Sequence, residues 1–360
     1  MTATQCGVFH ESYGSDLQLR PTTMQRIRIV LVLAVVVILP LVANNYLIRI
    51  SNSIIIAAIG AIGLNILVGY TGQISLGQGA FLAVGAYSSA LLTTYYDVPW
   101  PIAVILASFI TAGIGMMFGI PSLRLKGLYL AVATLAAQQI VQWVLNNWDP
   151  IDGIRDGRAT NALRIPDPKI FGYQLNQDEK AFYVFGVLIL IAVVIVTVNL
   201  FRTHVGRAFI AIRDQDIAAE VMGVNIFRYK LLAFATSSFF VGLAGALLAQ
   251  HSTAISWERF TIEISIQYLA MIIIGGLGTI SGSIYGAIFI TVLPELLREM
   301  GDFLTKSEVL NADDFRLYLP FIQRGAFGVA IVITLILEPE GIVKMWRDIK
   351  NYFRLWPFSY

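Results

Sequence analysis

Long apolar runs recur along this chain, and short polar segments separate them. Ten runs stand out, at residues 27–48, 53–71, 75–95, 101–120, 127–147, 181–201, 230–251, 264–277, 281–298 and 318–338. An α-helix needs roughly 20 apolar residues to cross a bilayer. The pattern therefore predicts an all-α, polytopic membrane protein with about ten transmembrane helices. The two short runs joined by GGLGTISGS are either two spans or one broken, partly re-entrant element.

Composition supports the membrane assignment and narrows the possible partners. The 360 residues are 57% hydrophobic and 13% charged, whereas soluble domains carry about 25% charged residues. Membrane lipid is therefore the expected surrounding. The net charge of +2 gives no reason to expect nucleic-acid binding. Cys6 is the only cysteine, which excludes an intramolecular disulfide.

The run pattern divides the chain into three parts. We expect a polar N-terminal tail at 1–26, a transmembrane domain at 27–338 and a C-terminal tail at 339–360. Ten spans place both termini on one side, and we assign that side to the cytoplasm because the short basic segments then lie there. The polar segments 148–180 and 299–317 then lie outside. The first is loop-like and either contacts a partner or is plain surface.

Glycines are concentrated in GYTGQISLGQGAFLAVGAY, residues 69–87. Small residues let helices pack closely in lipid. The same glycines, with Gln73 and Ser75, also predict a break in the helix, which a membrane tolerates only against protein or water. Transport sites are commonly built at such breaks. GYTGQIS at 69–75 and GGLGTIS at 275–281 share two glycines, Ile and Ser, through either an internal repeat or chance.

Polar side chains inside the apolar runs are candidates for a translocation pathway. Thr134, Gln138 and Gln142 are spaced four residues apart and share one helix face. Such a face either makes hydrogen bonds between helices or lines a wet pathway. Gln267 is similar in a later run. The candidate pathway residues are Gly72, Gln73, Ser75, Gln78, Thr134, Gln138, Gln142 and Gln267.

The segment 202–230 is the most informative polar part of the chain. RDQDIAAEVMGVNIFRYK predicts a short helix with Ile217, Val221 and Met222 on one side, small alanines that allow close approach, and Gly223 at its end. The segment either lies on lipid as a basic juxtamembrane helix or docks a soluble motor. The candidate docking residues are Arg213, Asp214, Ala218, Ala219, Glu220 and Gly223.

Motifs for catalysis are not found in the sequence. The chain has no G-x-x-x-x-G-K-[ST] loop for ATP, no H-E-x-x-H, no cysteine pair for a metal and no G-x-S-x-G elbow. We therefore expect no catalytic residue, metal or cofactor in this chain. A transporter is a better interpretation than an enzyme.

Several of these stretches resemble a known family. The segment 202–230 is similar to the ATPase-coupling loop of ABC importer permeases, which reads E-A-A, three residues, then G; here the order is Ala218-Ala219-Glu220 before Gly223. NILVGYTGQISLGQGAFLAVGAY, GLYLAVATLA at 127–136 and GRAFIAIRDQDIAAEVMGVN at 206–225 resemble the M-type permease subunit of branched-chain amino acid (Liv) ABC importers. The likeness covers most of residues 50–340.

The resemblance implies a function and a set of partners. The chain would translocate branched-chain amino acids across the cytoplasmic (inner) membrane. It would pair with a second, H-type permease subunit, with two cytoplasmic ABC ATPases that use ATP, and with an extracytoplasmic amino-acid-binding protein. Two alternatives stay open: a urea or short-amide ABC permease, and a non-ABC membrane channel or scaffold. Uptake competition between leucine and urea, and co-purification with an ATPase, would separate them.

Overall fold

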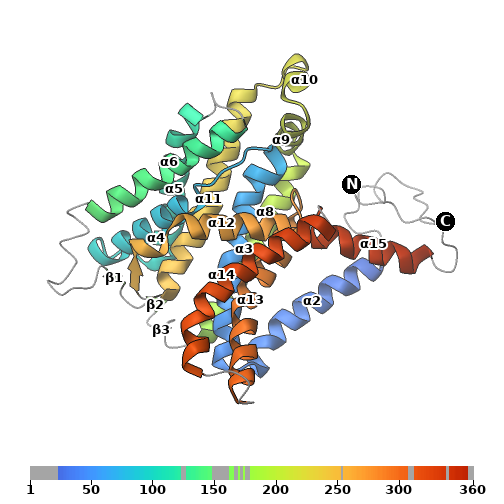
Figure 1. Ribbon diagram of the computed structural model, residues 1–360. Coiled ribbons are helices and arrows are strands. Elements are labelled where there is room, and N and C mark those ends of the chain that lie inside the picture. The colour runs from blue at the N-terminus through green and yellow to red at the C-terminus, as the bar shows by residue number, and fades with distance from the viewer. Residues whose placement is uncertain are drawn as a thin grey trace. The chain divides into compact units, whose positions relative to one another are not determined.

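The computed structural model describes residues 23–122, 127–147, 162–165, 169–170, 173–174, 179–252, 254–306, 312–337 and 340–355 (Figure 1). The chain divides into two compact units, residues 1–48 and 49–360, and each is described by itself. The long helices are α2 (Thr23–Val42), α3 (Asn45–Thr71), α4 (Gln78–Tyr95), α5 (Trp100–Ser122), α6 (Leu128–Asn147), α8 (Glu179–Arg202), α11 (Ile226–Ser252), α12 (Ile262–Gly275), α13 (Ile280–Lys306), α14 (Ala312–Leu337) and α15 (Ile342–Leu355).

Each predicted apolar run coincides with a helix, which confirms the all-α fold. Five helices in the described part of the chain are long and apolar enough to cross a membrane: α3, α5, α8, α11 and α13. The number of about ten spans stays a prediction. The boundary of the first run was wrong: α2 ends at Val42 and α3 already begins at Asn45. Asn44-Asn45 interrupts the apolar pattern there, and asparagine favours the start of a helix.

Close backbone contact holds the centre of the second unit together. α4, α5 and α11 lie side by side (Figure 1). A Cβ at Gly85 of α4 would overlap the backbone of Gly242 of α11, and a Cβ at Gly245 would overlap the carbonyl of Leu82. Because glycine has no Cβ, the two helices approach until their backbones touch. The predicted tight packing of the glycine-rich segment is confirmed here.

Burial differs strongly among the membrane-spanning helices. In α3, 83% of the most apolar 18-residue window is buried inside the chain, but in α8 and α13 the share is 28%. α3 therefore belongs to the core. α8 and α13 direct most of their apolar surface outward, as helices do that face lipid or another subunit.

Two short strand pairs accompany the helices. β1 (Ala162–Arg164) pairs antiparallel with β4 (Ala254–Ser256), and Leu163 lies opposite Ile255. Both of these side chains are buried. β2 (Lys169–Ile170) pairs with β3 (Tyr173–Gln174). The prediction that 148–180 has no element was wrong at these strands: β1 pairs with the distant β4, which is not a local feature, and β2 and β3 are only two residues long. Residues 148–161 lie outside the described residues.

Both predicted breaks between helices are confirmed. α3 ends at Thr71 and α4 begins at Gln78, while α12 ends at Gly275 and α13 begins at Ile280. Helices extend into the polar segment 299–317 from both of its ends. α13 continues through it to Lys306, and α14 begins at Ala312.

Candidate functional site: the coupling loop and the helix breaks

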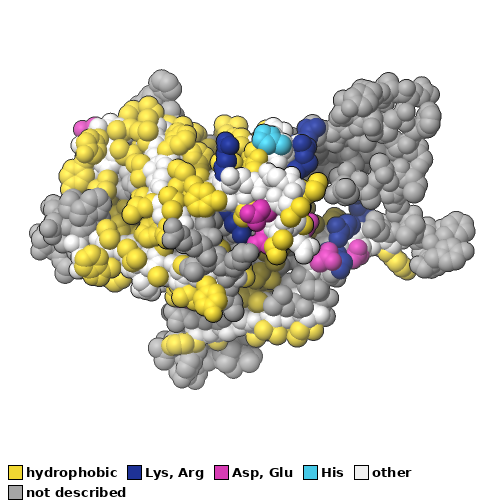
Figure 2. Space-filling model, turned by 90° about the horizontal axis from the view of Figure 1, so that it is seen from above, with side chains coloured by type: hydrophobic (Ala, Val, Ile, Leu, Met, Phe, Trp, Pro, Cys, Tyr) yellow, Lys and Arg dark blue, Asp and Glu magenta, His cyan; other side chains and the backbone are white. Residues whose placement is uncertain are grey.

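The predicted docking helix is present in the segment 202–230. α9 (His204–Asp214) is followed by α10 (Asp216–Val221), and Gly223 ends the turn with φ +86°. That left-handed conformation is one that glycine adopts without a steric penalty. In Figure 2, which views the molecule from above Figure 1, basic, acidic and histidine side chains gather on this face beside a broad hydrophobic area.

The apolar side of α10 points away from the rest of the chain. Ile217, Val221 and Met222 are 66%, 81% and 83% exposed, whereas Ala219 on the other side is buried. Ala218, Glu220 and the remaining docking candidates are exposed as well. Burying three such side chains against a partner is worth several kcal/mol, at about 1.5–3 kcal/mol for each fully buried one. The helix therefore has the surface that a docking element needs.

Arg213 connects this loop to the first helix break. Its Nη1 donates a hydrogen bond to the carbonyl of Gly69, with 3.1 Å between the two atoms. Its Nε and Nη2 bind Asp214, at 3.0 and 2.9 Å. A Cβ placed on Gly278 in the second break would lie 3.0 Å from Arg213 Nη1. One guanidinium group thus contacts both breaks.

The two breaks lie against each other and form one structure, here called the break junction (residues 69–72 and 275–279, with Asn65). Asn65 Nδ2 donates to the carbonyl of Thr279 and to Ser283 Oγ at 2.8 and 2.7 Å. The N–H of Gly278 donates back to Asn65 Oδ1 at 2.9 Å. The two segments that share a sequence pattern are therefore in direct contact. Sequence reasoning missed Asn65, although a single amide within an apolar run was a signal.

α15 begins at the same junction. A Cβ on Gly341 would lie 2.6 Å from the backbone nitrogen of Gly276. The helix α15 also packs on α12 and α13. The start of α15 and the coupling loop therefore lie at the same end of the bundle.

The polar face of α6 caps the start of α4. Thr134 Oγ1 accepts a hydrogen bond from the N–H of Leu76 at 2.9 Å, and Gln138 Oε1 accepts one from the N–H of Ala80 at 2.6 Å. Ser265 Oγ of α12 accepts one from the N–H of Gly79 at 2.8 Å. Gly79 and Ala80 belong to the first turn of α4, where a helix leaves backbone donors without intrahelical partners, and Leu76 lies just before that turn. The side chains thus satisfy the broken helix inside the protein.

The amide nitrogens of α6 hold a second irregular segment. Gln138 Nε2 and Gln142 Nε2 both donate to the carbonyl of Phe260, each at 2.6 Å. Gln78 Nε2 donates to the carbonyl of Gly60 at 3.0 Å, and Gln73 Nε2 to Thr71 Oγ1 at 3.0 Å. Of the two interpretations of the α6 face, hydrogen bonding between elements is the one that the structure contains. A role in lining the pathway stays a prediction.

A cavity of about 320 Å³ joins the coupling loop to the first break. Gly72 and Gln73 line it together with Arg213 and Asp214. Predicted pathway residues and predicted docking residues therefore meet at one place. Gln267 does not belong to this group: it lines a separate cavity between α12, α13 and α14.

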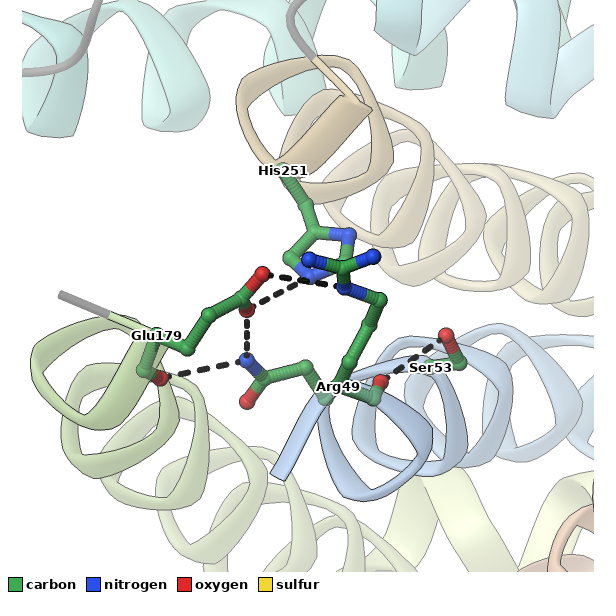
Figure 3. A network of polar contacts seen from close by, with 5 residues as sticks. Arg49, Ser53, Glu179 and His251 are labelled. Carbon is green, nitrogen blue, oxygen red and sulfur yellow. Dashed lines mark hydrogen bonds and ion pairs between the residues drawn. The ribbon is translucent and has the colours of Figure 1, made fainter. Parts of the chain in front are cut away.

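A network of polar contacts occupies the opposite end of the bundle (Figure 3). Glu179 at the start of α8 binds Arg49 Nε at 3.2 Å, Asn52 Nδ2 at 3.1 Å and His251 Nε2 at 3.3 Å. These partners come from α3 and α11. The network fastens three helices, and sequence reasoning missed it because each member is a single ionisable or amide residue near a run end.

Comparisons with known proteins identify the family. Residues 46–323 match the family described as "Branched-chain amino acid transport system / permease component". The chain belongs to this family. It is 32% identical over 348 residues to the high-affinity branched-chain amino acid transport system permease protein LivM of Salmonella typhimurium. The aligned region covers 91% of this chain and 76% of the relative. The LivM protein of Escherichia coli gives the same identity and coverage.

Members and relatives of this permease family differ in the cargo that their names give. A probable branched-chain amino acid permease, LivH of Methanocaldococcus jannaschii, is 25% identical over 81% of this chain and 90% of its own length. The fructose import permease FruG of Bifidobacterium longum is 25% identical over 64% of this chain and 69% of its own length. No solved structure matches. The chain is thus a multi-pass membrane permease component, as its resemblance and its apolar helices predict.

Proposed function

We propose that this chain is the permease subunit of an ABC importer that moves branched-chain amino acids across the cytoplasmic membrane. The family match over 46–323 and the 32% identity to LivM support this substrate class. The partners are a second, H-type permease subunit, two cytoplasmic ABC ATPases and an extracytoplasmic amino-acid-binding protein. The ATPases use the ATP, and this chain contributes no catalytic residue.

The hydrogen bond from Arg213 to Gly69 carries the mechanistic part of the proposal. The exposed apolar side of α10 docks on an ATPase. When the ATPases close, α9 and α10 move, and Arg213 transmits that movement to the break junction. A hinge is a short segment in which a few residues change their backbone angles. The junction contains Gly69, Gly72, Gly275, Gly276 and Gly278, whose backbone can change in this way. Movement there reorients α4 and α13, which continue from the two breaks.

Docking of the ATPases on α10 also determines the orientation of this chain in the membrane. The coupling loop faces the cytoplasm, and because Gly341 contacts the break junction, α15 begins on that side. The cytoplasmic position of both chain termini is part of this proposal and rests on the predicted number of ten spans. The Glu179 network then lies at the extracytoplasmic end, where the binding protein delivers its cargo.

The test is uptake by the reconstituted importer. Proteoliposomes that contain both permeases and the ATPases, with the binding protein and labelled leucine added outside and ATP inside, should accumulate leucine. Excess unlabelled leucine should abolish the signal, and excess urea should not. Urea competition would transfer the substrate to the short-amide class, and uptake without the ATPases would identify a channel.

A single position tests the docking surface. Val221→Asp places a carboxylate on the exposed apolar side of α10, at a position that is 81% exposed, so the fold should survive. We expect this variant to lose ATPase subunits during purification and to lose uptake. Val221→Thr keeps the side-chain shape and is the matched control. Unchanged co-purification of the ATPases with Val221→Asp would refute the docking assignment.

A further inference from the structure

The second cavity, of about 390 Å³, combines acidic, amide and apolar side chains. It lies between three helices. Its walls include Glu263, Gln267 and Met271 of α12, Glu295 of α13, and Gln323 and Phe327 of α14. α12 ends and α13 begins at the second break, so two walls of this cavity belong to helices that meet at the break junction.

The carboxylate of Glu295 on a membrane-spanning helix limits the surroundings to which the cavity can be open. α13 is apolar enough to span a membrane, yet only 28% of its most apolar window is buried in the chain. Glu295 lies within that helix, with its side chain 29% exposed and Arg298 3.5 Å away. Ionisable side chains on membrane spans face a bundle interior or a water-filled cavity, because acyl chains do not solvate them. The cavity therefore opens to water or to the second permease subunit.

The walls present hydrogen-bond acceptors to whatever enters. Pro294 also lines the cavity, and because proline has no N–H, the carbonyl of Ile290 loses its helical donor. Gln323 Nε2 donates a hydrogen bond to the carbonyl of Pro294 at 3.3 Å. The amide oxygen of Gln323 is therefore the atom of this side chain that would accept a hydrogen bond from a ligand. Met271 and Phe327 add an apolar side to the same space.

We propose that this cavity forms part of the substrate passage and receives the ammonium group of the transported amino acid. Glu263 and Glu295 attract the ammonium group, Gln267 accepts a hydrogen bond from it, and the aliphatic side chain lies against Met271 and Phe327. The inference rests on the proposed function and adds the place where the amino group is recognised.

The test uses the single native cysteine. In a Cys6→Ser background, Gln267→Cys supplies one thiol in the cavity of the assembled importer. It is labelled from the aqueous phase with a cationic thiosulfonate (ethylammonium) or an anionic one (ethylsulfonate). The carboxylates should favour the cationic reagent by about tenfold, because a cleft lined by negative charge attracts and concentrates ions of the opposite charge. Leucinol, which keeps the amine and lacks the carboxylate, should protect the thiol, whereas 4-methylpentanoate should not.

Two matched substitutions test whether Glu295 causes the preference for the cationic reagent. Glu295→Gln should reduce the cation preference, and Glu299→Gln, one turn further along the same helix and exposed, should leave it unchanged. No labelling from water, or equal rates for both reagents, would overturn the proposal. ATP-driven leucine uptake by the Cys6→Ser importer is measured separately, so failure of the proposed function is distinguished from failure of this site.

The helix α15 carries a second inference, from a different observation. At 100° per residue, Ile342, Met345, Trp346, Ile349 and Tyr352 share one face. Lys344, Arg347 and Lys350 lie on the other. The apolar face is not covered by the rest of the second unit: Met345, Trp346 and Tyr352 are 48%, 62% and 59% exposed.

We infer that α15 lies on the surface of the membrane, with its apolar face among the headgroups and acyl chains of anionic lipid. The helix begins at the break junction, directly after the last apolar helix. Basic residues beside a strip of Trp, Ile and Tyr are the pattern of helices that lie in the interface. The basic side attracts anionic headgroups, and because the helix follows directly on an apolar helix, its exposed face lies within reach of the membrane surface; lipid is therefore the occupant.

Spin labels on the two faces test this. In the Cys6→Ser full chain, Trp346→Cys and Arg347→Cys are labelled and placed in nanodiscs that contain phosphatidylglycerol. The label at 346 should collide with dissolved oxygen and not with a water-soluble nickel chelate, and the label at 347 should do the reverse. Lys350→Glu should raise nickel access at 346. Equal nickel access at both positions, or a 346 label shielded from both reagents, would overturn the inference.

Discussion

Arg213→Ala is the sharpest test of the transmission mechanism. The side chain gives one hydrogen bond from a cation to the carbonyl of Gly69, at 3.1 Å. Hydrogen bonds to charged groups contribute about 1.5–3 kcal/mol. The Arg213 side chain is 39% exposed, and water competes for exposed charges. We therefore assign about 1–2 kcal/mol to the contact with the junction.

That energy sets the expected size of the effect. Every 1.4 kcal/mol is a factor of ten in an equilibrium, so removing the contact should lower leucine uptake per ATP hydrolysed by about tenfold. ATP hydrolysis itself should continue, because the ATPase sites lie in other subunits. Arg213→Lys keeps the charge but lacks the fork of donors that binds Gly69 and Asp214 together, so its uptake should be intermediate.

The assay measures uptake and phosphate release in the same proteoliposomes. Arg207→Ala is the matched control: it removes an exposed arginine from α9, and the hydrogen bond that Arg207 makes runs 3.5 Å to the carbonyl of Arg202, away from the junction. Its ratio of uptake to hydrolysis should equal that of the unmodified chain. A normal ratio for Arg213→Ala would refute transmission through this contact.

Three other predictions concern packing and polar contacts, each measured as the melting temperature of the purified protein in detergent. Gly85→Ala forces a Cβ into the backbone of Gly242, and overpacking should destabilise the protein by about 1–3 kcal/mol. Gln138→Leu removes the hydrogen bonds to the N–H of Ala80 and to the carbonyl of Phe260; because Gly77 and Gln142 still bind these two groups, we expect a loss of about 0.5–1.5 kcal/mol for each lost bond. Glu179→Gln keeps the shape but removes the charge that Arg49 and His251 share, and we expect a loss of about 1 kcal/mol. Unchanged melting in any of the three would contradict the corresponding contact.

Much of the architecture could be predicted from the sequence because the membrane makes hydrophobicity decisive. The apolar runs coincide with helices, and glycine with polar neighbours marks both breaks. The end of the docking helix at Gly223 was also predicted, since a local backbone preference determines it. The predicted end of the first run at residue 48 was wrong, because hydrophobicity alone does not show that the helix already ends at Val42, before Asn44-Asn45.

Contacts between distant segments could not be predicted in the same way. Arg213 was selected as a docking residue from its place in a loop, yet its partner Gly69 lies far away in the sequence. The pairing of Leu163 with Ile255 depends on where α6, α8 and α11 end in space. Gln267 was grouped with the α6 amides on residue type alone, and only the fold shows that Gln267 lines a cavity whereas Gln138 and Gln142 bind the carbonyl of Phe260.

The capping of α4 constrains how the transporter works. The start of a broken helix carries partial positive charge and free N–H groups, which suit the carboxylate of a substrate. Here the donors of Leu76, Gly79 and Ala80 are already bound by buried side chains. A substrate carboxylate would have to displace protein hydrogen bonds without gaining new ones. In this conformation the first break therefore suits a hinge better than a binding site for the carboxylate of the cargo.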